Sequence, residues 1–166
     1  MIDKPYQPPF FDQDDEGSDE GPFAGRLSHL GGFKARTGDV VVSVRTMWLD
    51  DQSSPEERHY CWLYHVIVEN RGRASLQLLG RSWTCIGCNG QTHQLEDGDV
   101  GGEQPVIAPQ SAFEYTATAE MDMPGAFIMG VYHAVHATPA GLWHADDIIV
   151  PSFSLDMPSL LLHDKH

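Results

Sequence analysis

The chain has 166 residues, 41% of them hydrophobic and 20% charged, which is typical of one globular domain with its own core. Its formal net charge of −14 argues against a nucleic acid or an anionic membrane as the main partner. No apolar stretch approaches the ~20 residues of a membrane-spanning helix, and the N-terminus lacks the basic start and apolar middle of a secretory signal. Three cysteines do not make a disulfide framework. These features predict a cytoplasmic protein with reduced thiols.

The first 34 residues are expected to form an acidic, disordered arm outside the folded domain. Within residues 1–25, seven Asp and Glu residues stand against Lys4 alone, and prolines and glycines fill much of the rest. A segment of this composition buries too little apolar surface to offset the entropy lost when the chain becomes ordered. The predicted domain therefore covers residues 35–158, and residues 159–166 form a C-terminal tail.

From residue 38 onward, apolar and polar side chains alternate with the period of a β-strand. About seven strands are predicted, over residues 40–48, 60–68, 76–86, 91–96, 113–119, 126–135 and 142–155. Asn89-Gly90 predicts a tight hairpin turn between the third and fourth of them. Because no window has the apolar period of a helix, the chain is predicted to be all-β, and its spacing favours a two-sheet sandwich over a closed barrel.

Arg81 and Trp83 are predicted to share one face of their strand with Leu79 and Cys85. An arginine on an otherwise apolar face needs a carboxylate or carbonyl partner, or must lie at the sheet edge with its stem packed on Trp83.

A glycine-rich segment over residues 97–105 interrupts the strand pattern, with the sequence Asp-Gly-Asp-Val-Gly-Gly-Glu-Gln-Pro. Its glycines indicate positive φ angles or unusually close backbone approach. The favoured interpretation is a structural turn that holds two strands together. Such a turn can also direct backbone N–H groups at an anion, and the candidate ligand-binding residues are Gly98, Gly101, Gly102 and Gln104.

The same segment carries three carboxylates, those of Asp97, Asp99 and Glu103. Oxygen ligands of this kind suit a hard divalent cation such as calcium or magnesium. The spacing is not that of an EF-hand loop. A divalent-cation site at these three residues is therefore an alternative to the structural turn.

Other metal-ligating patterns are weaker. Cys85 and Cys88 have the spacing of half a zinc site, but a closed zinc site takes four ligands, so one buried strand cysteine and one turn cysteine are expected. His133 and His136 lie three positions apart on a predicted strand and therefore point to opposite faces. No known hydrolase, zinc-protease or phosphate-loop motif occurs, and no catalytic residue is predicted.

Several short segments of the sequence, taken in order with the glycine-rich segment, resemble the ApaG family over roughly residues 38–158. They are Gln52-Ser53-Ser54-Pro55, Leu76-Gln77-Leu78-Leu79-Gly80-Arg81-Ser82-Trp83, Asn89-Gly90 and Pro124-Gly125-Ala126-Phe127-Ile128-Met129-Gly130-Val131-Tyr132. The resemblance implies a fibronectin type III-like or immunoglobulin-like β-sandwich.

The resemblance also places the family's G-x-G-x-x-G pattern at Asp97, Asp99 and Gly102, so two of its three glycines are aspartates here. A diphosphate at this place would meet two negative charges, and a dinucleotide motif needs a helix that an all-β chain does not offer.

The resemblance implies a non-catalytic protein associated with tolerance of divalent cobalt and magnesium, and it suggests a protein-interaction module. We expect no required cofactor and at most a divalent cation. The expected partner is another protein, or a second copy of the chain, bound at a sheet edge, with no nucleic acid and no membrane. The alternative is a small-ligand protein that binds a divalent cation or a nucleotide diphosphate at the glycine-rich segment.

Overall fold

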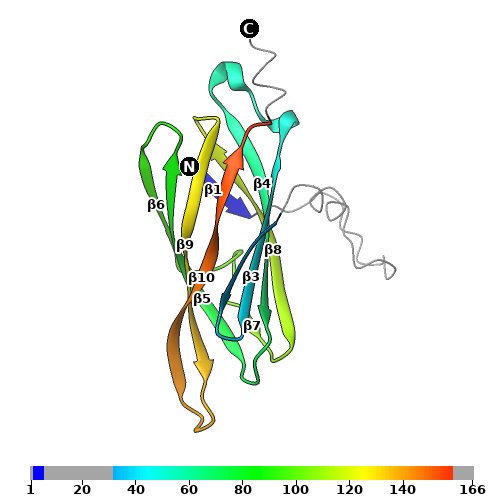
Figure 1. The fold of residues 1–166 in the computed structure, drawn as a ribbon, viewed down its shortest axis with the longest axis vertical. Helices are drawn as coiled ribbons and strands as arrows, with labels where there is room; N and C mark the ends of the chain where they lie inside the picture. Colours follow the sequence, from blue (N-terminus) through cyan, green and yellow to red (C-terminus); the bar gives the residue numbers. More distant parts are fainter. Residues whose placement is uncertain (1, 6–31, 159–166) are drawn as a thin grey trace, which may run out of the picture.

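A computed structural model describes residues 2–5 and 32–158, whose strands form two antiparallel sheets packed face to face (Figure 1). The first sheet contains, in spatial order, β1 (Ile2–Pro5), β8 (Ser111–Met121), β4 (Tyr60–Asn70), β3 (Val40–Trp48) and β2 (Gly32–Thr37). The second contains β10 (Trp143–Asp156), β9 (Gly125–Ala137), β5 (Leu76–Gly87) and β6 (Thr92–Asp97), and the short β7 (Val106–Ile107) pairs with β5. The predicted all-β sandwich is confirmed.

All seven predicted strands are present, as β3, β4, β5, β6, β8, β9 and β10. Two single 3-10 turns, η1 (Asp50–Gln52) and η2 (Pro55–Glu57), connect β3 to β4. Strands β1, β2 and β7 were not predicted. Within the described ranges, no helix has the length and apolar character needed to cross a membrane.

The prediction of a disordered arm over residues 1–34 is wrong at both ends of that range, where the structure has β-strands. The backbone of Ile2–Pro5 pairs with residues 117–120 of β8, and β2 begins at Gly32, before the predicted domain boundary. An edge strand can join a sheet through backbone groups alone, which composition does not report. The remainder of the predicted arm, residues 6–31, and the predicted tail over 159–166 lie outside the described residues.

The core between the sheets is centred on the fully buried Trp83 of β5. Its ring lies 5.8 Å from that of Tyr64 on β4, 5.7 Å from that of Tyr132 on β9 and 5.8 Å from that of Phe153 on β10. Aromatic pairs at such distances contribute about 1 kcal/mol beyond the burial of their surface. This cluster therefore ties three strands of the second sheet to the centre of the first.

A β-bulge in β5 sets which side chains face this core. The register of β5 against β9 shifts between Leu78 and Gly80, so Leu79 is an extra residue without its own partner. The buried positions are even-numbered before the bulge and odd-numbered after it, from Arg81 onward. The prediction that Leu79 shares a face with Arg81 is therefore wrong, because the bulge reverses the alternation between them.

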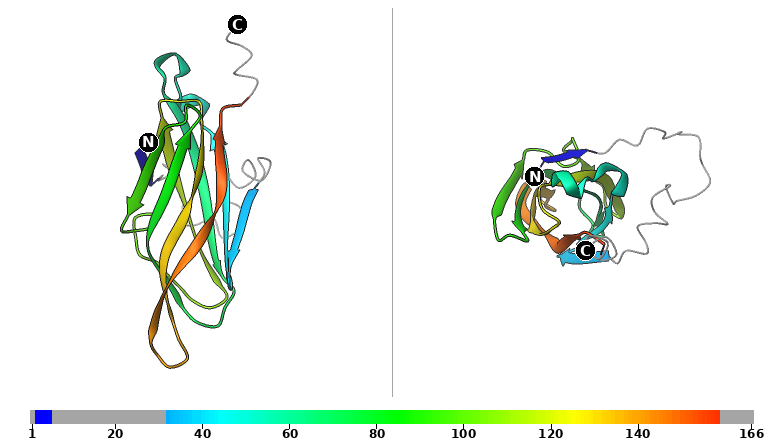
Figure 2. Two further views of the ribbon diagram at one scale, coloured as in Figure 1. Left: turned by 60° about the vertical axis from the view of Figure 1, so that its left-hand side comes forward. Right: turned by 90° about the horizontal axis from the view of Figure 1, so that it is seen from above.

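The two lateral sides of the sandwich differ. On one side β10 packs against β2 and β3, and the backbone N–H of Ile149 donates a hydrogen bond to Thr37 Oγ1 at 2.9 Å. β1 and β2 lie at opposite edges of the first sheet, as the two views of Figure 2 show. The glycine-rich segment follows β6, the edge strand at the other end of the second sheet from β10.

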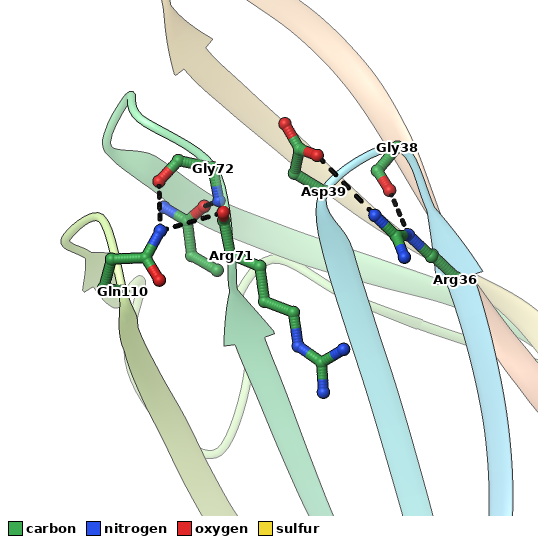
Figure 3. Close-up of polar contacts among 7 residues, drawn as sticks. Arg36, Gly38, Asp39, Arg71, Gly72 and Gln110 are labelled. Atoms are coloured by element: carbon green, nitrogen blue, oxygen red, sulfur yellow. Dashed lines mark hydrogen bonds and ion pairs between the residues drawn. The ribbon is translucent and has the colours of Figure 1, made fainter.

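Polar side chains form hydrogen bonds that stabilise the loops at one end of the sandwich (Figure 3). The side-chain amide of Gln110 donates hydrogen bonds to the carbonyl oxygens of Arg71 at 2.9 Å and Gly72 at 3.1 Å. In the neighbouring β2–β3 hairpin, Arg36 Nε donates to the carbonyl oxygen of Gly38 at 2.7 Å. The β4–β5 connection is thereby tied to the residue that precedes β8.

The three cysteines differ enough in burial to be told apart chemically. Cys61 and Cys85 are buried, and burial raises the pKa of both thiols, whereas Cys88 is exposed in the β5–β6 turn. We expect the native protein to show one fast-reacting thiol toward Ellman's reagent, and three after unfolding in guanidinium. Cys88→Ser should remove the fast phase and Cys85→Ser should retain it; two fast thiols in the wild type would contradict the burial.

Candidate functional site

The glycine-rich segment forms a tight turn bonded to itself. The N–H of Val100 donates to the carbonyl oxygen of Glu103 at 2.7 Å, and the N–H of Glu103 donates back to Val100 at 3.3 Å. Between them Gly101 and Gly102 have φ angles of 63° and 86°. Two successive positive φ angles are those of a type I′ turn, which favours glycine at both positions. Val100 is 1% exposed and anchors the turn in the core.

Gln104 fastens this turn to the rest of the molecule. Its side-chain nitrogen donates to the carbonyl oxygens of Leu79 at 3.1 Å and Gly98 at 3.0 Å. The N–H of Leu78 donates to the carbonyl oxygen of Pro105 at 3.0 Å. Two of the four candidate ligand-binding residues, Gly98 and Gln104, therefore take part in bonds that hold the segment against the bulge of β5.

The buried Arg81 lies beneath the segment and determines what Asp97 does. Arg81 is 7% exposed; its Nε donates to Asp97 Oδ2 at 2.6 Å and its Nη1 donates to the Tyr64 hydroxyl at 3.2 Å. Its guanidinium carbon also lies 4.5 Å from the centre of the Trp83 ring. Desolvating a guanidinium without a counter-charge costs several kcal/mol. Asp97 is thus a counter-ion of Arg81.

Gly80 makes this approach possible. A Cβ atom at position 80 would lie 2.3 Å from the carbonyl oxygen of Asp97, a distance that real atoms do not adopt. The absence of a side chain on Gly80 therefore lets the end of β6 reach Arg81.

A cavity of about 240 Å³ opens beside this ion pair, between the two sheets. It is lined by Tyr64, Arg81, Asp97, Asp99, Gly101, Gly102, Tyr115 and Ala117. Gly101 and Gly102, the other two candidate ligand-binding residues, thus contribute to its wall. A Cβ atom at Gly101 would lie 2.9 Å from the ring of Tyr115, so the turn packs closely against β8.

The hydroxyl group of Tyr115, a residue of the lining, shares a hydrogen bond with that of the buried Tyr132 behind it. Burial raises the pKa of Tyr132 well above its ordinary value, and Tyr115 adds to the shift. Tyr132 is therefore a neutral phenol at physiological pH. The guanidinium, carboxylates and phenol groups of the lining residues provide donors and acceptors suited to binding a small polar molecule.

The predicted cation site is not assembled. Among the residues that the structure describes, no group of three or more His, Cys, Asp or Glu side chains could hold a metal ion. Asp97, Asp99 and Glu103 are neighbours in sequence, but the carboxylate of Asp97 is bound to Arg81. Cation binding at this segment stays a prediction, because a carboxylate near a glycine turn looks the same in sequence whether it meets a cation from solution or an arginine from the next strand.

The cysteine and histidine predictions agree with the structure. Cys85 is a buried strand residue and Cys88 an exposed turn residue. His133 lies on the outer face of β9 and bonds to Asp147, whereas His136 packs its ring 5.3 Å from that of His144.

A second cavity, of about 390 Å³, lies at the end of the sandwich between the β2–β3 hairpin, the β4–β5 connection and the β9–β10 hairpin. Its polar lining includes Asp39, Asn70, Arg73, His136 and Asp146. Asn70 is buried, and its side chain donates to the carbonyl oxygens of Ala74 and Ile107 at 2.8 and 3.0 Å.

Sequence reasoning missed Tyr64, Tyr115 and Ala117 as lining residues of the first cavity. Strand alternation assigns such side chains to the inner face of a sheet. Which inner residues meet the glycine-rich segment depends on how the two sheets are placed against each other, and the alternation carries no signal for that placement.

Comparisons with known proteins agree with this fold. A family model described as the ApaG domain matches residues 50–136. A protein named ApaG from Paramagnetospirillum magneticum is 36% identical over 133 residues, which cover 80% of this chain and 96% of that protein. The Rhodospirillum centenum protein of the same name is 39% identical, over 74% of this chain and 91% of its own length. The crystal structure of a putative ApaA protein from Bordetella pertussis superposes with a TM-score of 0.64 at 30% identity, covering 72% of this chain and 94% of that one.

The assignment of Asp97 as a counter-ion predicts a difference between two neighbouring aspartates. Asp97→Asn removes a charged hydrogen-bond partner from the buried guanidinium and, because the Asp97 side chain is itself 45% exposed, should lower the free energy of unfolding by about 2 kcal/mol. Asp99→Asn, at an exposed position of the same segment, should change it by less than about 0.5 kcal/mol. Urea denaturation measures both values, and equal small effects would show that Arg81 does not depend on Asp97.

The raised pKa of Tyr132 predicts a loss of stability in alkali. The unfolded chain ionises this tyrosine near its ordinary pKa of about 10 while the folded protein keeps it neutral, so stability is complete below that pH and falls above it. The expected slope is about 1.4 kcal/mol per pH unit for one group. Denaturation at pH 8 to 11 should show a shallower decline for Tyr132→Phe, and an unchanged decline would mean that other groups cause it.

Proposed function

The chain belongs to the ApaG family, and from this premise we propose that it is a non-catalytic protein-interaction module that binds a partner protein through its β9–β10 hairpin. We define the hairpin surface as the exposed apolar side chains of β9, β10 and the loop between them. They are Phe127, Met129, Leu142, Trp143 and Ile149.

The distribution of exposed apolar side chains supports this proposal. In the described part of the chain, five of the six large apolar side chains with high exposure belong to the hairpin surface, and Val106 is the sixth. Leu142 is 68% exposed and Trp143 59% exposed at the hairpin loop, which extends beyond the other loops at that end of the sandwich (Figure 1). Ile149, Phe127 and Met129 are 52%, 41% and 36% exposed on the outer face of the second sheet. Exposed apolar side chains concentrated on one hairpin in this way are typical of interaction surfaces.

The chemistry of the partner follows from the charges around this surface. The whole chain carries a net charge of −14, and the exposed Asp146 and Asp147 lie on β10 itself. We expect a partner segment that presents apolar side chains to Trp143 and Ile149 and basic side chains to the acidic rim. Tryptophan is also among the residues enriched in binding hot spots.

Within this proposal the protein acts in the cytoplasm, requires no cofactor, and has neither nucleic acid nor membrane as its partner. The tolerance of cobalt and magnesium that the family resemblance implies would be exerted through the partner protein. That route fits a described part of the chain in which no metal-ligating group of three side chains is assembled.

The cavity beside Arg81 supports a second candidate function, the binding of a small polar molecule. Its volume of about 240 Å³ is below the ~300–1,000 Å³ of pockets that hold drug-sized ligands. Asp97 and Asp99 in its lining would repel a diphosphate. Size and charge therefore favour a molecule of a few heavy atoms over the nucleotide diphosphate considered from the sequence.

The test compares surface variants of the full chain in binding to one partner. A partner is captured from extracts of the source cells by immobilised wild-type protein, purified, and titrated by calorimetry. Trp143→Ser and Ile149→Ser should each weaken binding tenfold or more, about 1.4 kcal/mol. Val106→Ser is the matched control, because Val106 is 61% exposed but lies outside the hairpin surface. Equal affinity for all four proteins would refute the hairpin surface as the binding site.

A further inference from the structure

Three polar side chains on the outer face of the second sheet form a continuous hydrogen-bonded chain that the proposed function does not use. Ser82 on β5, His133 on β9 and Asp147 on β10 lie on neighbouring strands. Ser82 Oγ is 2.7 Å from His133 Nε2, and His133 Nδ1 is 2.9 Å from Asp147 Oδ1. The contacts therefore run from a hydroxyl through an imidazole to a carboxylate.

The chemistry of these groups fixes the direction of both hydrogen bonds. An ionised carboxylate only accepts, so the proton of a neutral His133 lies on Nδ1 and is donated to Asp147. His133 Nε2 then carries a lone pair and accepts the hydroxyl proton of Ser82. This is the relation of nucleophile, general base and orienting carboxylate by which serine is activated on several unrelated folds.

The fold places these residues by strand register and by the bulge in β5. His133 and Asp147 are directly opposed in the β9–β10 ladder, and Ser82 lies two pairs further along the β5–β9 ladder, opposite Val131. The bulge at Leu79 turns Ser82 outward, on the face opposite to the buried Arg81 and Trp83. The three side chains are partly or fully exposed, so a small molecule in solution can reach the hydroxyl.

We propose that Ser82 is a base-activated acyl acceptor that takes an acyl group from uncharged carboxylic esters with a short apolar acyl chain. Ser82 Oγ attacks the carbonyl carbon and its proton passes to His133 Nε2. The ester C–O bond then breaks, and the alcohol leaves with the proton that His133 returns to it. The product is an ester on Ser82 and a free alcohol, and Asp147 acts as a positioning residue throughout.

The surroundings of Ser82 define this substrate class. Val131 is its partner in the β5–β9 ladder, and Ile149, 52% exposed, is the partner of Val131 on β10, so an apolar acyl group can rest on both. On the other side, Ser82 is paired with the acidic Glu96 of β6. Glu96 and Asp147 together disfavour anionic substrates.

The architecture favours transfer of an acyl group to Ser82 over rapid release of that group in a catalytic cycle. β5 is paired with β9 and with β6 from Arg81 to Ile86, so its N–H groups lie in the plane of the sheet and serve the two ladders. The acceleration at Ser82 is then that of a positioned general base, about 10²–10⁴-fold. We expect the acyl group to remain on Ser82 long enough to be detected.

The experiment measures acylation of the full-length protein by p-nitrophenyl butyrate and by an uncharged alkyl fluorophosphonate, with mass spectrometry locating the modified residue. The label should appear on Ser82, at least 100-fold faster than on Ser154. Ser154 is the matched internal control, because its hydroxyl bonds to the carboxylate of Asp156 at 2.8 Å without an imidazole between them.

Variants distinguish activation of the Ser82 hydroxyl by His133 from simple exposure of that hydroxyl to solvent. Ser82→Ala should abolish the label and His133→Gln should slow it about 100-fold, whereas Ser154→Ala should leave it unchanged. Asp147→Asn should slow it about tenfold and Asp147→Glu should recover part of the rate, which distinguishes a positioning carboxylate from a structural one. The proposal is overturned if Ser82 is labelled no faster than Ser154, or if His133→Gln reacts at the wild-type rate while its melting temperature is unchanged. Both outcomes are independent of partner binding, so the proposed function is not tested by them.

Discussion

The buried guanidinium of Arg81 sets the constraint on which the surrounding structure depends, because a charge that is only 7% exposed must keep its partners. Tyr64 reaches it from the opposite sheet, and Asp97 reaches it from the end of β6. Holding Asp97 there fixes where the glycine-rich segment begins. The face of Trp83 beneath the guanidinium joins this polar pair to the aromatic core. Ion pair, turn and core are therefore one structural unit.

The strands were predictable because alternation reports which side chains are buried, and the seven predicted strands depend on that burial. The bulge at Leu79 was not predictable, since one extra residue leaves the apolar pattern readable on either side of it while reversing the face of everything that follows. β1 was missed because it joins the edge of the sheet from a segment whose composition indicates disorder.

The candidate sites were less predictable than the fold because each depends on pairs far apart in the sequence. Asp97 is sixteen positions from Arg81, and nothing local separates a counter-ion from a metal ligand. Ser82 and His133 are 51 positions apart, and His133 and Asp147 are 14 apart. Their contact follows from strand order and register. Histidines could be assigned to faces from parity, but their neighbours on the adjoining strands could not.

The first strand has a consequence for solubility. β1 covers residues 117–120 of β8, at the outer edge of the first sheet. Unpaired strand edges are templates on which a second chain can add its own strand, and natural sheets shield them to avoid aggregation. A protease that removed the first few residues would leave both sheets and the aromatic core in place. It would, however, uncover this part of the edge of β8 and make the trimmed protein more prone to self-association.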